Sequence, residues 1–294
     1  DNMPAVSSTK SFTGHTTSAS GSLEAVICLL ALQHSFHPAN LGWQHPMPDG
    51  IIPTLGAMGQ CMQHVMCNSF GFGGNDSSLI LSKADTQPHA GITTPLSTVY
   101  VKAVNVHKPA DGPVDITQFV PKMEARRMCK LLKSAIFTSL TALKQAGIDT
   151  PDGIVTATEY GMLENSEKFL TQMCSEGEDC LKPTLFMQST HNTIGGALGI
   201  LLKCHGYNIT FSDGAESLRC ALLDARLQLE LGRARHMLVG YHNELTTCFA
   251  DMERRLYGRE TTPGETSIVL VLTTEAEGAQ CTLDDFDLDT LIHS

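Results

Sequence analysis

The strongest constraint on the fold is an alternation of short apolar segments with helical patterns between residues 99 and 272. In residues 123–146, for example, the apolar side chains recur at helical spacing and Gly147 follows as a C-cap. Strands that alternate with helices in this way predict an α/β fold with a mostly parallel sheet, covered by helices on both faces. The expected strands are 99–106, 153–158, 208–212, 237–240 and 267–272, and the expected helices are 123–146, 165–173, 193–203 and 214–231.

The first 85 residues predict a smaller arrangement of their own. Residues 5–9 have the pattern of a short buried strand, and residues 14–32 that of a helix whose first half contains only small side chains. Such a helix can approach another backbone or a ligand closely. Two further strands, 64–70 and 77–82, are joined by a glycine-rich turn and predict a hairpin.

Proline, glycine and a lack of periodicity mark residues 86–97 as a linker. The expected organisation is therefore a first domain at 1–85, the linker at 86–97, a second domain at 98–275 and a C-terminal tail at 276–294. The chain starts at Asp1 without the pattern of a signal peptide, and we expect a fragment or a processed product.

Composition excludes several classes of protein. Apolar residues make up 42% of the chain and charged residues 17%, as in a packed globular protein. The formal net charge of −11 argues against nucleic acid or an anionic membrane as the main partner, and no apolar run is long enough for a membrane span. The 10 cysteines form no CxxC pair, so we expect free thiols in a reducing cytoplasm and no metal site.

Two motifs about 55 residues apart carry a resemblance. The first is Ser8–Gly21, with the pattern S-x-K-x-x-x-G-H, and the second is Asn68–Asn75, which reads N-S-F-G-F-G-G-N. In this order and spacing they closely resemble the last quarter of β-ketoacyl-acyl-carrier-protein synthases, the condensing enzymes of fatty-acid and polyketide synthesis. The resemblance implies a thiolase-like α/β fold of layered helices and mixed sheets, and no cofactor.

The resemblance also implies roles for single residues. His15 would donate a hydrogen bond to the thioester oxygen, on which negative charge develops during decarboxylation. A position at a helix N-terminus would keep its imidazole neutral. Lys10 would be a buried ammonium that organises the charges of the site. The implied substrate-binding residues are Phe70, Gly71, Phe72, Gly73 and Asn75, with the backbone of Phe72 in an oxyanion hole.

Residues 98–275 carry a fainter resemblance to the N-terminal half of the same family. Where that family has the elbow T-A-C-x-S-S-L before a helix, this chain has Ser212–Leu218, with Gly214 at the cysteine position. Glycine cannot form an acyl thioester, so Gly214 is expected to be a degenerate nucleophile position and a structural elbow. Cys220, in the second turn of the expected helix, is the alternative nucleophile, and His191 is expected to be structural.

Two hypotheses for function stay open at this point. In the first, the chain is part of an acyltransferase that elongates acyl chains, as Lys10 and His15 indicate. In the second, the domain at 98–275 is a non-catalytic partner similar to a chain length factor, as Gly214 indicates. Either implies an acyl carrier protein and a ketosynthase-type subunit, in a homodimer or heterodimer, as partners. The charged runs 253–255 and 284–287 are expected to be solvated.

Overall fold

The computed structural model describes residues 3–59, 61–71, 75–84, 96–179, 181–288 and 291. By its contacts the chain divides into two compact units. Apart from residues 72–75, the first unit comprises Asp1–Gly71 and Asp76–Thr93, and the second comprises Thr94–Ser294. The expected linker at 86–97 lies mostly outside the described residues.

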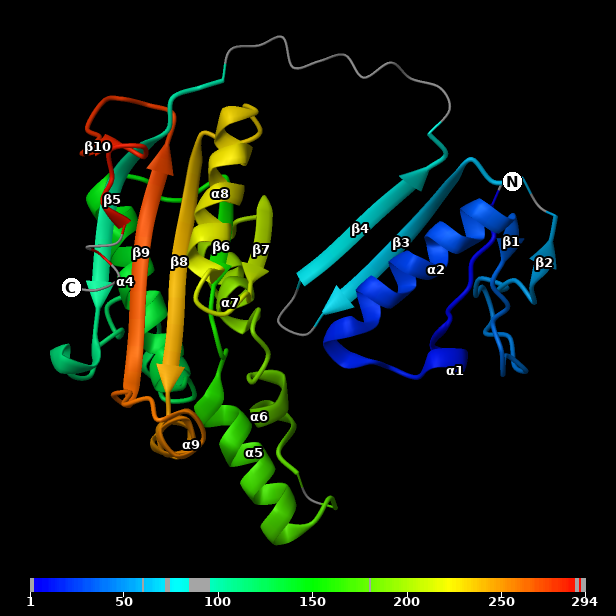
Figure 1. Cartoon of the computed structure of the whole chain (residues 1–294), viewed down its shortest axis with the longest axis horizontal. Coiled ribbons are helices and arrows are strands. Elements are labelled where there is room, and N and C mark those ends of the chain that lie inside the picture. The colour runs from blue at the N-terminus through cyan, green and yellow to red at the C-terminus, as the bar shows by residue number, and fades with distance from the viewer. Residues whose placement is uncertain are drawn as a thin grey trace. The chain divides into compact units, whose positions relative to one another are not determined.

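The first unit contains a helix packed on a two-stranded sheet (Figure 1). Strands β3 (His64–Gly71) and β4 (Asn75–Ser82) run in opposite directions, as the expected hairpin requires. Helix α2 (Ser20–His34) contacts β3 so closely that a Cβ on Gly21 would lie 2.9 Å from Ser69 Oγ. The small residues in the first half of this helix therefore permit the close approach that the sequence predicted. The remaining elements are α1 (Lys10–Thr13), η1 (Thr17–Ala19), β1 (Phe36–His37) and β2 (Ala57–Met58).

Two expectations for the first unit are wrong. Residues 5–9 form no strand, since their backbone makes single hydrogen bonds with the segment 40–54 rather than a ladder. One of these joins the Thr54 N–H to the Val6 carbonyl at 2.8 Å. The long helix begins at Ser20 instead of residue 14, because Gly14 and Thr17 have left-handed φ angles of +69° and +49° that end any continuous helix there.

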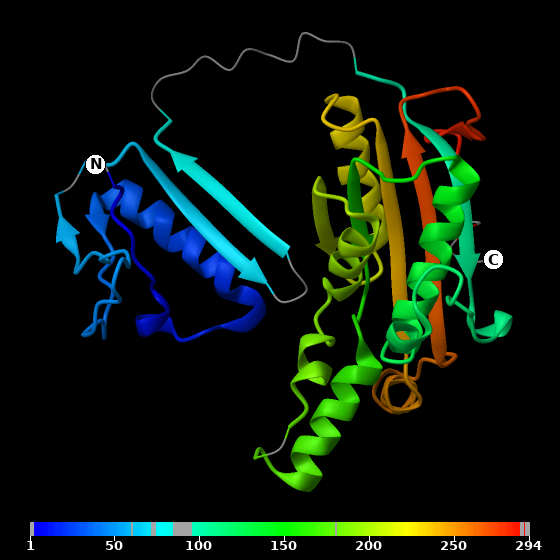
Figure 2. The same ribbon diagram turned by 180° about the vertical axis from the view of Figure 1, so that it is seen from behind.

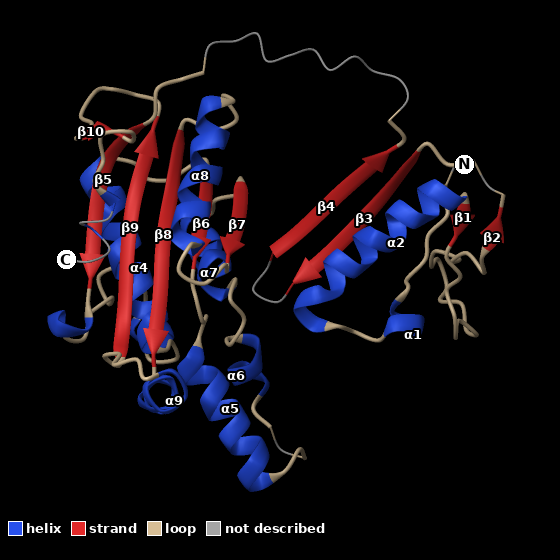
Figure 3. Ribbon diagram, viewed as in Figure 1, coloured by secondary structure: helices blue, strands red, loops and turns tan. Residues whose placement is uncertain are grey.

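The second unit is built on a six-stranded mixed sheet in the order β10-β5-β9-β8-β6-β7 (Figures 1 and 3). Only the pairs β6–β7 and β6–β8 are parallel, and the other three pairs are antiparallel. The expected mostly parallel sheet is therefore wrong, whereas the α/β class is confirmed. The strands are β5 (Tyr100–His107), β6 (Gly153–Ala157), β7 (Tyr207–Phe211), β8 (His236–Leu245), β9 (Gly264–Thr273) and β10 (Cys281–Thr282).

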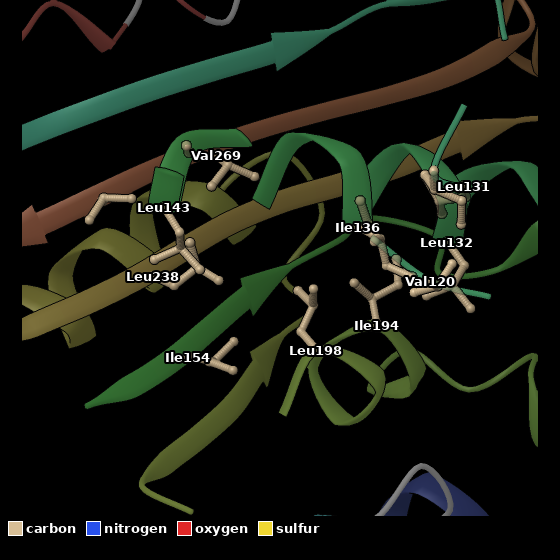
Figure 4. Packing of buried hydrophobic residues seen from close by; sticks show 14 of the residues in the cluster. Val120, Leu131, Leu132, Ile136, Leu143, Ile154, Ile194, Leu198, Leu238 and Val269 are labelled. Atoms are coloured by element: carbon tan, nitrogen blue, oxygen red, sulfur yellow. The ribbon is translucent and has the colours of Figure 1, made fainter. Parts of the chain in front are cut away.

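Helices cover both faces of this sheet. One core cluster joins α4 (Lys130–Ala146) and α7 (Thr193–Leu202) to side chains such as Ile154 and Leu238 (Figure 4). The other joins α8 (Ser217–Glu230) to the alternate residues of the same strands, such as Val155 and Val239. Below this sandwich, α5 (Leu163–Glu176) and α6 (Pro183–Met187) extend past the end of the sheet (Figure 2).

Several helices differ from the sequence prediction; α8, for example, begins at Ser217 rather than at residue 214, and α6 was not predicted. The expected helix 123–146 is divided into α3 (Lys122–Ala125) and α4, because Cys129 interrupts it and accepts the Leu132 N–H as an N-cap. An unexpected helix, α9 (Thr247–Tyr257), joins β8 to β9, and the Thr246 hydroxyl caps it by accepting the Phe249 N–H at 3.1 Å. A short 3-10 helix, η2 (Pro109–Asp111), follows β5.

One residue of the charged runs near the C-terminus is less solvated than expected. Glu253 in α9 is buried and pairs with Arg259 at 3.4 Å, so solvation is the wrong expectation for this residue. Asp284 is exposed and pairs with Arg226 of α8 at 2.6 Å. Residues after 275 add β10 to the sheet edge, and Phe286 packs against the core.

Candidate functional site

His15 lies on the surface of the first unit in the loop before η1. Its Nδ1 atom accepts the backbone N–H of Thr17 at 3.1 Å and lies 3.2 Å from the Ser20 hydroxyl. A backbone N–H can only donate, so Nδ1 carries no proton and the neutral ring holds its proton on Nε2. The exposed ring therefore presents an N–H donor, which is what stabilisation of a developing oxyanion needs. The expected helix N-terminus is not at His15 but five residues later.

Lys10 belongs to α1 and forms an ion pair with Glu24 of α2. Its side chain is 41% exposed and that of Glu24 is 16% exposed, so within this unit Lys10 is not the buried ammonium that the resemblance implied. The pair joins the two helices that flank His15. It thereby fixes a positive charge and a hydrogen-bond donor on the same short stretch of chain.

The second motif meets the first through the packing of α2 on β3. Gly21, next to Ser20, lies against Ser69, next to Phe70, so segments about 50 residues apart in sequence are neighbours here. Phe70 and Gly71 end β3, and the Phe70 side chain is 78% exposed. Phe72 and Gly73 lie outside the described residues, as does the side chain of Asn75, so their substrate-binding role stays a prediction.

The elbow of the second unit lies between β7 and α8. Gly214 has a φ of +52°, and a Cβ there would meet no atom within 4 Å. The buried Ser217 hydroxyl accepts the Asp213 N–H at 2.8 Å and lies 2.7 Å from the Gly214 carbonyl, so it braces the turn. Cys220 is half-buried in α8, with its Sγ 3.8 Å from Asp213 Oδ2. The elbow is thus present without a nucleophile at its tip.

A cavity of about 1010 Å³ opens beside the end of β8. Its wall includes Glu244, which is only 6% exposed and whose Oε1 accepts the Glu164 N–H at 2.9 Å. Burial raises the pKa of Glu244 to about 7, although the hydrogen bond from Glu164 opposes this, and the nearby carboxylates of Glu164, Glu265 and Glu167 add to the rise. The run His242-Asn243-Glu244 is polar at the end of an apolar strand, which is the only sequence signal of this environment.

His242 is a second buried titratable group on β8. Its Nδ1 lies 2.8 Å from Ser267 Oγ, which in turn lies 2.6 Å from Thr138 Oγ1 on α4. Burial lowers the pKa of His242 to about 3, so the ring is neutral at physiological pH. His242 is thus enclosed between the sheet and α4 and is only 1% exposed. His191, by contrast, is exposed, and its ring lies close to Gly161.

Among the described residues, no group of three or more His, Cys, Asp or Glu side chains is arranged to hold a metal ion. Within the same residues, no helix combines the length and the apolar character that crossing a membrane requires.

Comparison with known proteins identifies both units. Residues 102–291 match the family described as beta-ketoacyl synthase, N-terminal domain, and residues 1–44 match beta-ketoacyl synthase, C-terminal domain. The chain is 40% identical over 81 residues to 3-oxoacyl-[acyl-carrier-protein] synthase 2 of Vibrio cholerae. This match covers 26% of this chain and 20% of that protein. It thus spans about a fifth of the length of the curated relatives that it matches.

Solved structures share the fold at low sequence identity. The ketosynthase ApeO in complex with its chain length factor ApeC from Xenorhabdus doucetiae matches with a TM-score of 0.51 and 21% identity, over 61% of this chain and 80% of that chain. The PfaC keto synthase–chain length factor matches with a TM-score of 0.66 and 13% identity, over 93% of this chain and 40% of that chain. These matches confirm the thiolase-like α/β fold that the motifs implied. Since the N-terminal domain family alone accounts for residues 102–291, more than half of the sequence, the chain belongs to the β-ketoacyl synthase family.

Proposed function

We propose that the chain takes part in acyl-chain condensation and that its first unit supplies the decarboxylation chemistry. The observation that carries this proposal is the hydrogen bond from the Thr17 N–H to His15 Nδ1, which leaves the ring with an outward N–H donor on Nε2. The same stretch of chain holds the Lys10–Glu24 pair. The 40% identity of the matched segment to a 3-oxoacyl-[acyl-carrier-protein] synthase supports the assignment.

The proposed reaction begins with a malonyl thioester. Its carboxylate leaves as CO₂, and the electron pair of the broken C–C bond forms an enolate whose negative charge lies on the thioester oxygen. A hydrogen bond from His15 Nε2 stabilises that oxygen as charge develops, and the Lys10 ammonium adds a favourable field. Without an acyl acceptor, the enolate takes a proton from water and gives an acetyl thioester.

The second unit has a different proposed role. A condensing enzyme needs a cysteine at the elbow, and this chain has Gly214 there in a left-handed conformation. We infer that this unit is non-catalytic and acts in the manner of a chain length factor, as a partner that shapes the space for an acyl chain. The PfaC keto synthase–chain length factor, which covers 93% of this chain, supports that arrangement at the level of fold.

The partners of this function are a ketosynthase-type subunit and an acyl carrier protein. Among the described strands, β7 ends the sheet, and the helices α7 and α8 that contact it expose Ile200 and Leu223 by 77% and 61%. An open strand edge with apolar flanks supports pairing with another subunit of similar fold. The scattered cysteines without CxxC spacing support a cytoplasmic location.

The test is an assay of malonyl-acyl-carrier-protein with the purified chain, followed by mass spectrometry. We expect slow conversion to the acetyl form and no β-ketoacyl product, because the elbow lacks a nucleophile. His15→Gln should abolish the conversion, while Ser22→Ala, a change at an exposed position of α2, should leave it unchanged. Formation of a β-ketoacyl product would contradict the non-catalytic role of the second unit, and decarboxylation that survives His15→Gln would contradict the role of His15.

A further inference from the structure

The thiols of Cys28 and Cys67 meet where α2 packs on β3. Gly21 lies against Ser69 in this interface, and from there the two elements run in opposite directions (Figure 1). Cys28 comes two helical turns after Gly21, on the same face of α2. Cys67 comes two residues before Ser69, on the same face of β3. The two sulfur atoms therefore face each other, and they are in hydrogen-bonding contact.

The core of the first unit is very small. Among the described residues of this unit, only Ala31, Leu32 and Cys67 are buried. Cys28 is half-buried one helical turn before Ala31 and Leu32. A small unit that buries so little apolar surface gains stability from a cross-link, a metal or a partner. A covalent bond between Cys28 and Cys67 would act at the centre of this core.

We propose that Cys28 and Cys67 are an oxidisable pair whose disulfide joins α2 to β3. The oxidant is a small disulfide such as oxidised glutathione. One protein sulfur attacks it and releases a first glutathione, and the second protein sulfur then attacks the mixed disulfide and releases another. The two protein thiols lose two electrons to one glutathione disulfide, and their two protons end on the two glutathione thiols.

The surroundings of Cys28 limit the rate of this exchange. Burial raises the pKa of Cys28 to about 11, and the neighbouring Cys67 and Glu24 add to the rise. Only the thiolate attacks a disulfide, so exchange that starts at Cys28 is slow at pH 7 and about tenfold faster at pH 8. The pair is therefore suited to a lasting link formed under sustained oxidation and not to rapid sensing of an oxidant.

The disulfide would close a loop that contains little regular structure. Between the two cysteines, the described elements are the end of α2, the start of β3 and the two-residue strands β1 and β2. A cross-link across about 40 residues restricts mainly the unfolded chain, so the unfolding midpoint of this unit should rise by about 10 °C or more. Trp43, the single tryptophan of the chain, lies within the loop and reports on this unit by its fluorescence.

The experiment incubates the full chain with mixtures of reduced and oxidised glutathione at pH 7 and pH 8. N-ethylmaleimide then blocks the remaining thiols, and mass spectrometry identifies the unreduced peptides. We expect a linked Cys28–Cys67 peptide to predominate over glutathione adducts at these two positions, and to form about tenfold faster at pH 8. The fluorescence of Trp43 should show that the oxidised chain unfolds about 10 °C or more above the reduced chain.

Two variants serve as a matched pair. Cys28→Ser removes one sulfur and should abolish both the linked peptide and the rise in the unfolding midpoint. Cys61→Ser changes an exposed thiol of the same unit and should retain both. Unlinked thiols or separate glutathione adducts at Cys28 and Cys67 would overturn the pairing, and a linked peptide with an unchanged midpoint would overturn the joining of α2 to β3. Neither result depends on the decarboxylation assay.

Discussion

Replacing Glu244 with glutamine should stabilise the second unit in a strongly pH-dependent way. The carboxyl is 6% exposed and its folded pKa is about 7, against an ordinary value of 4.5. The folded state binds the proton of the Glu244 carboxyl more tightly than the unfolded chain does. The buried carboxyl therefore does not lower the free energy of unfolding below pH 4.5, where it is protonated in both states, and lowers it increasingly as the pH rises toward 7. This difference between the folded and ordinary pKa lowers the free energy of unfolding by about 3 kcal/mol near pH 8, where the group is ionised in both states, and by less than about 1 kcal/mol at pH 5.

The amide of Glu244→Gln keeps an oxygen that can accept the Glu164 N–H, so the substitution removes the charge and preserves the hydrogen bond. The assay is urea unfolding followed by far-ultraviolet circular dichroism at pH 5 and pH 8. We expect a gain of about 2–3 kcal/mol at pH 8 and a much smaller gain at pH 5. Glu178→Gln, a matched change at an exposed position, should stay within about 0.5 kcal/mol at both pH values. Equal gains at the two pH values would refute the reasoning, because burial of the charge would then not be the cause.

Three other positions test the same structure. Because burial lowers the pKa of His242 to about 3, the unfolded chain binds a proton on this ring below pH 6.5, whereas the folded chain does not. The free energy of unfolding should therefore fall by about 1 kcal/mol per pH unit between pH 6 and pH 4. Urea unfolding of His242→Gln should lack this contribution to the pH dependence. Gly195→Ala should cost about 1–3 kcal/mol, since its Cβ would lie 2.9 Å from Asn208 Oδ1, and an unchanged thermal midpoint would contradict the packing of α7. Gly214→Cys should place a thiol in open space before α8, and this thiol should react with iodoacetamide at pH 6.5 several times faster than Cys220. Peptide mass spectrometry would measure both rates. Equal rates would mean that the elbow does not activate a thiol.

The sequence predicted most elements of the second unit because burial and helical periodicity are local signals. The relative direction of the strands is not a local signal: β9 runs antiparallel to β8 after the helix α9. This helix was not predicted, because the run 253–255 was interpreted as solvated charge. The break before α4 depends on Cys129 acting as a cap, which its apolar neighbours gave no reason to expect.

For the candidate site, the two motifs were sufficient to identify the family, since they are short stretches of fixed chemistry. Their environment was not predictable in the same way. The exposure of Lys10 and its pairing with Glu24 depend on how α1 and α2 pack, and the left-handed backbone at Thr17 is unfavourable on propensity alone. The buried Glu244 was missed because its burial comes from α5, which lies about 80 residues earlier in the chain.

The strand order of the second unit has a consequence for how this unit folds. Its first strand, β5, pairs with β9 and β10, so Val101 meets Leu272 and Cys281 across about 170–180 residues of chain. Closing so long a loop is entropically expensive before the new contacts compensate, and topologies of this kind fold slowly. During synthesis, β5 has to wait without its sheet neighbours until nearly the whole unit has left the ribosome, whereas β6, β7 and β8 can assemble around α8 earlier. The apolar β5 is therefore the segment most in need of protection from aggregation in a nascent chain.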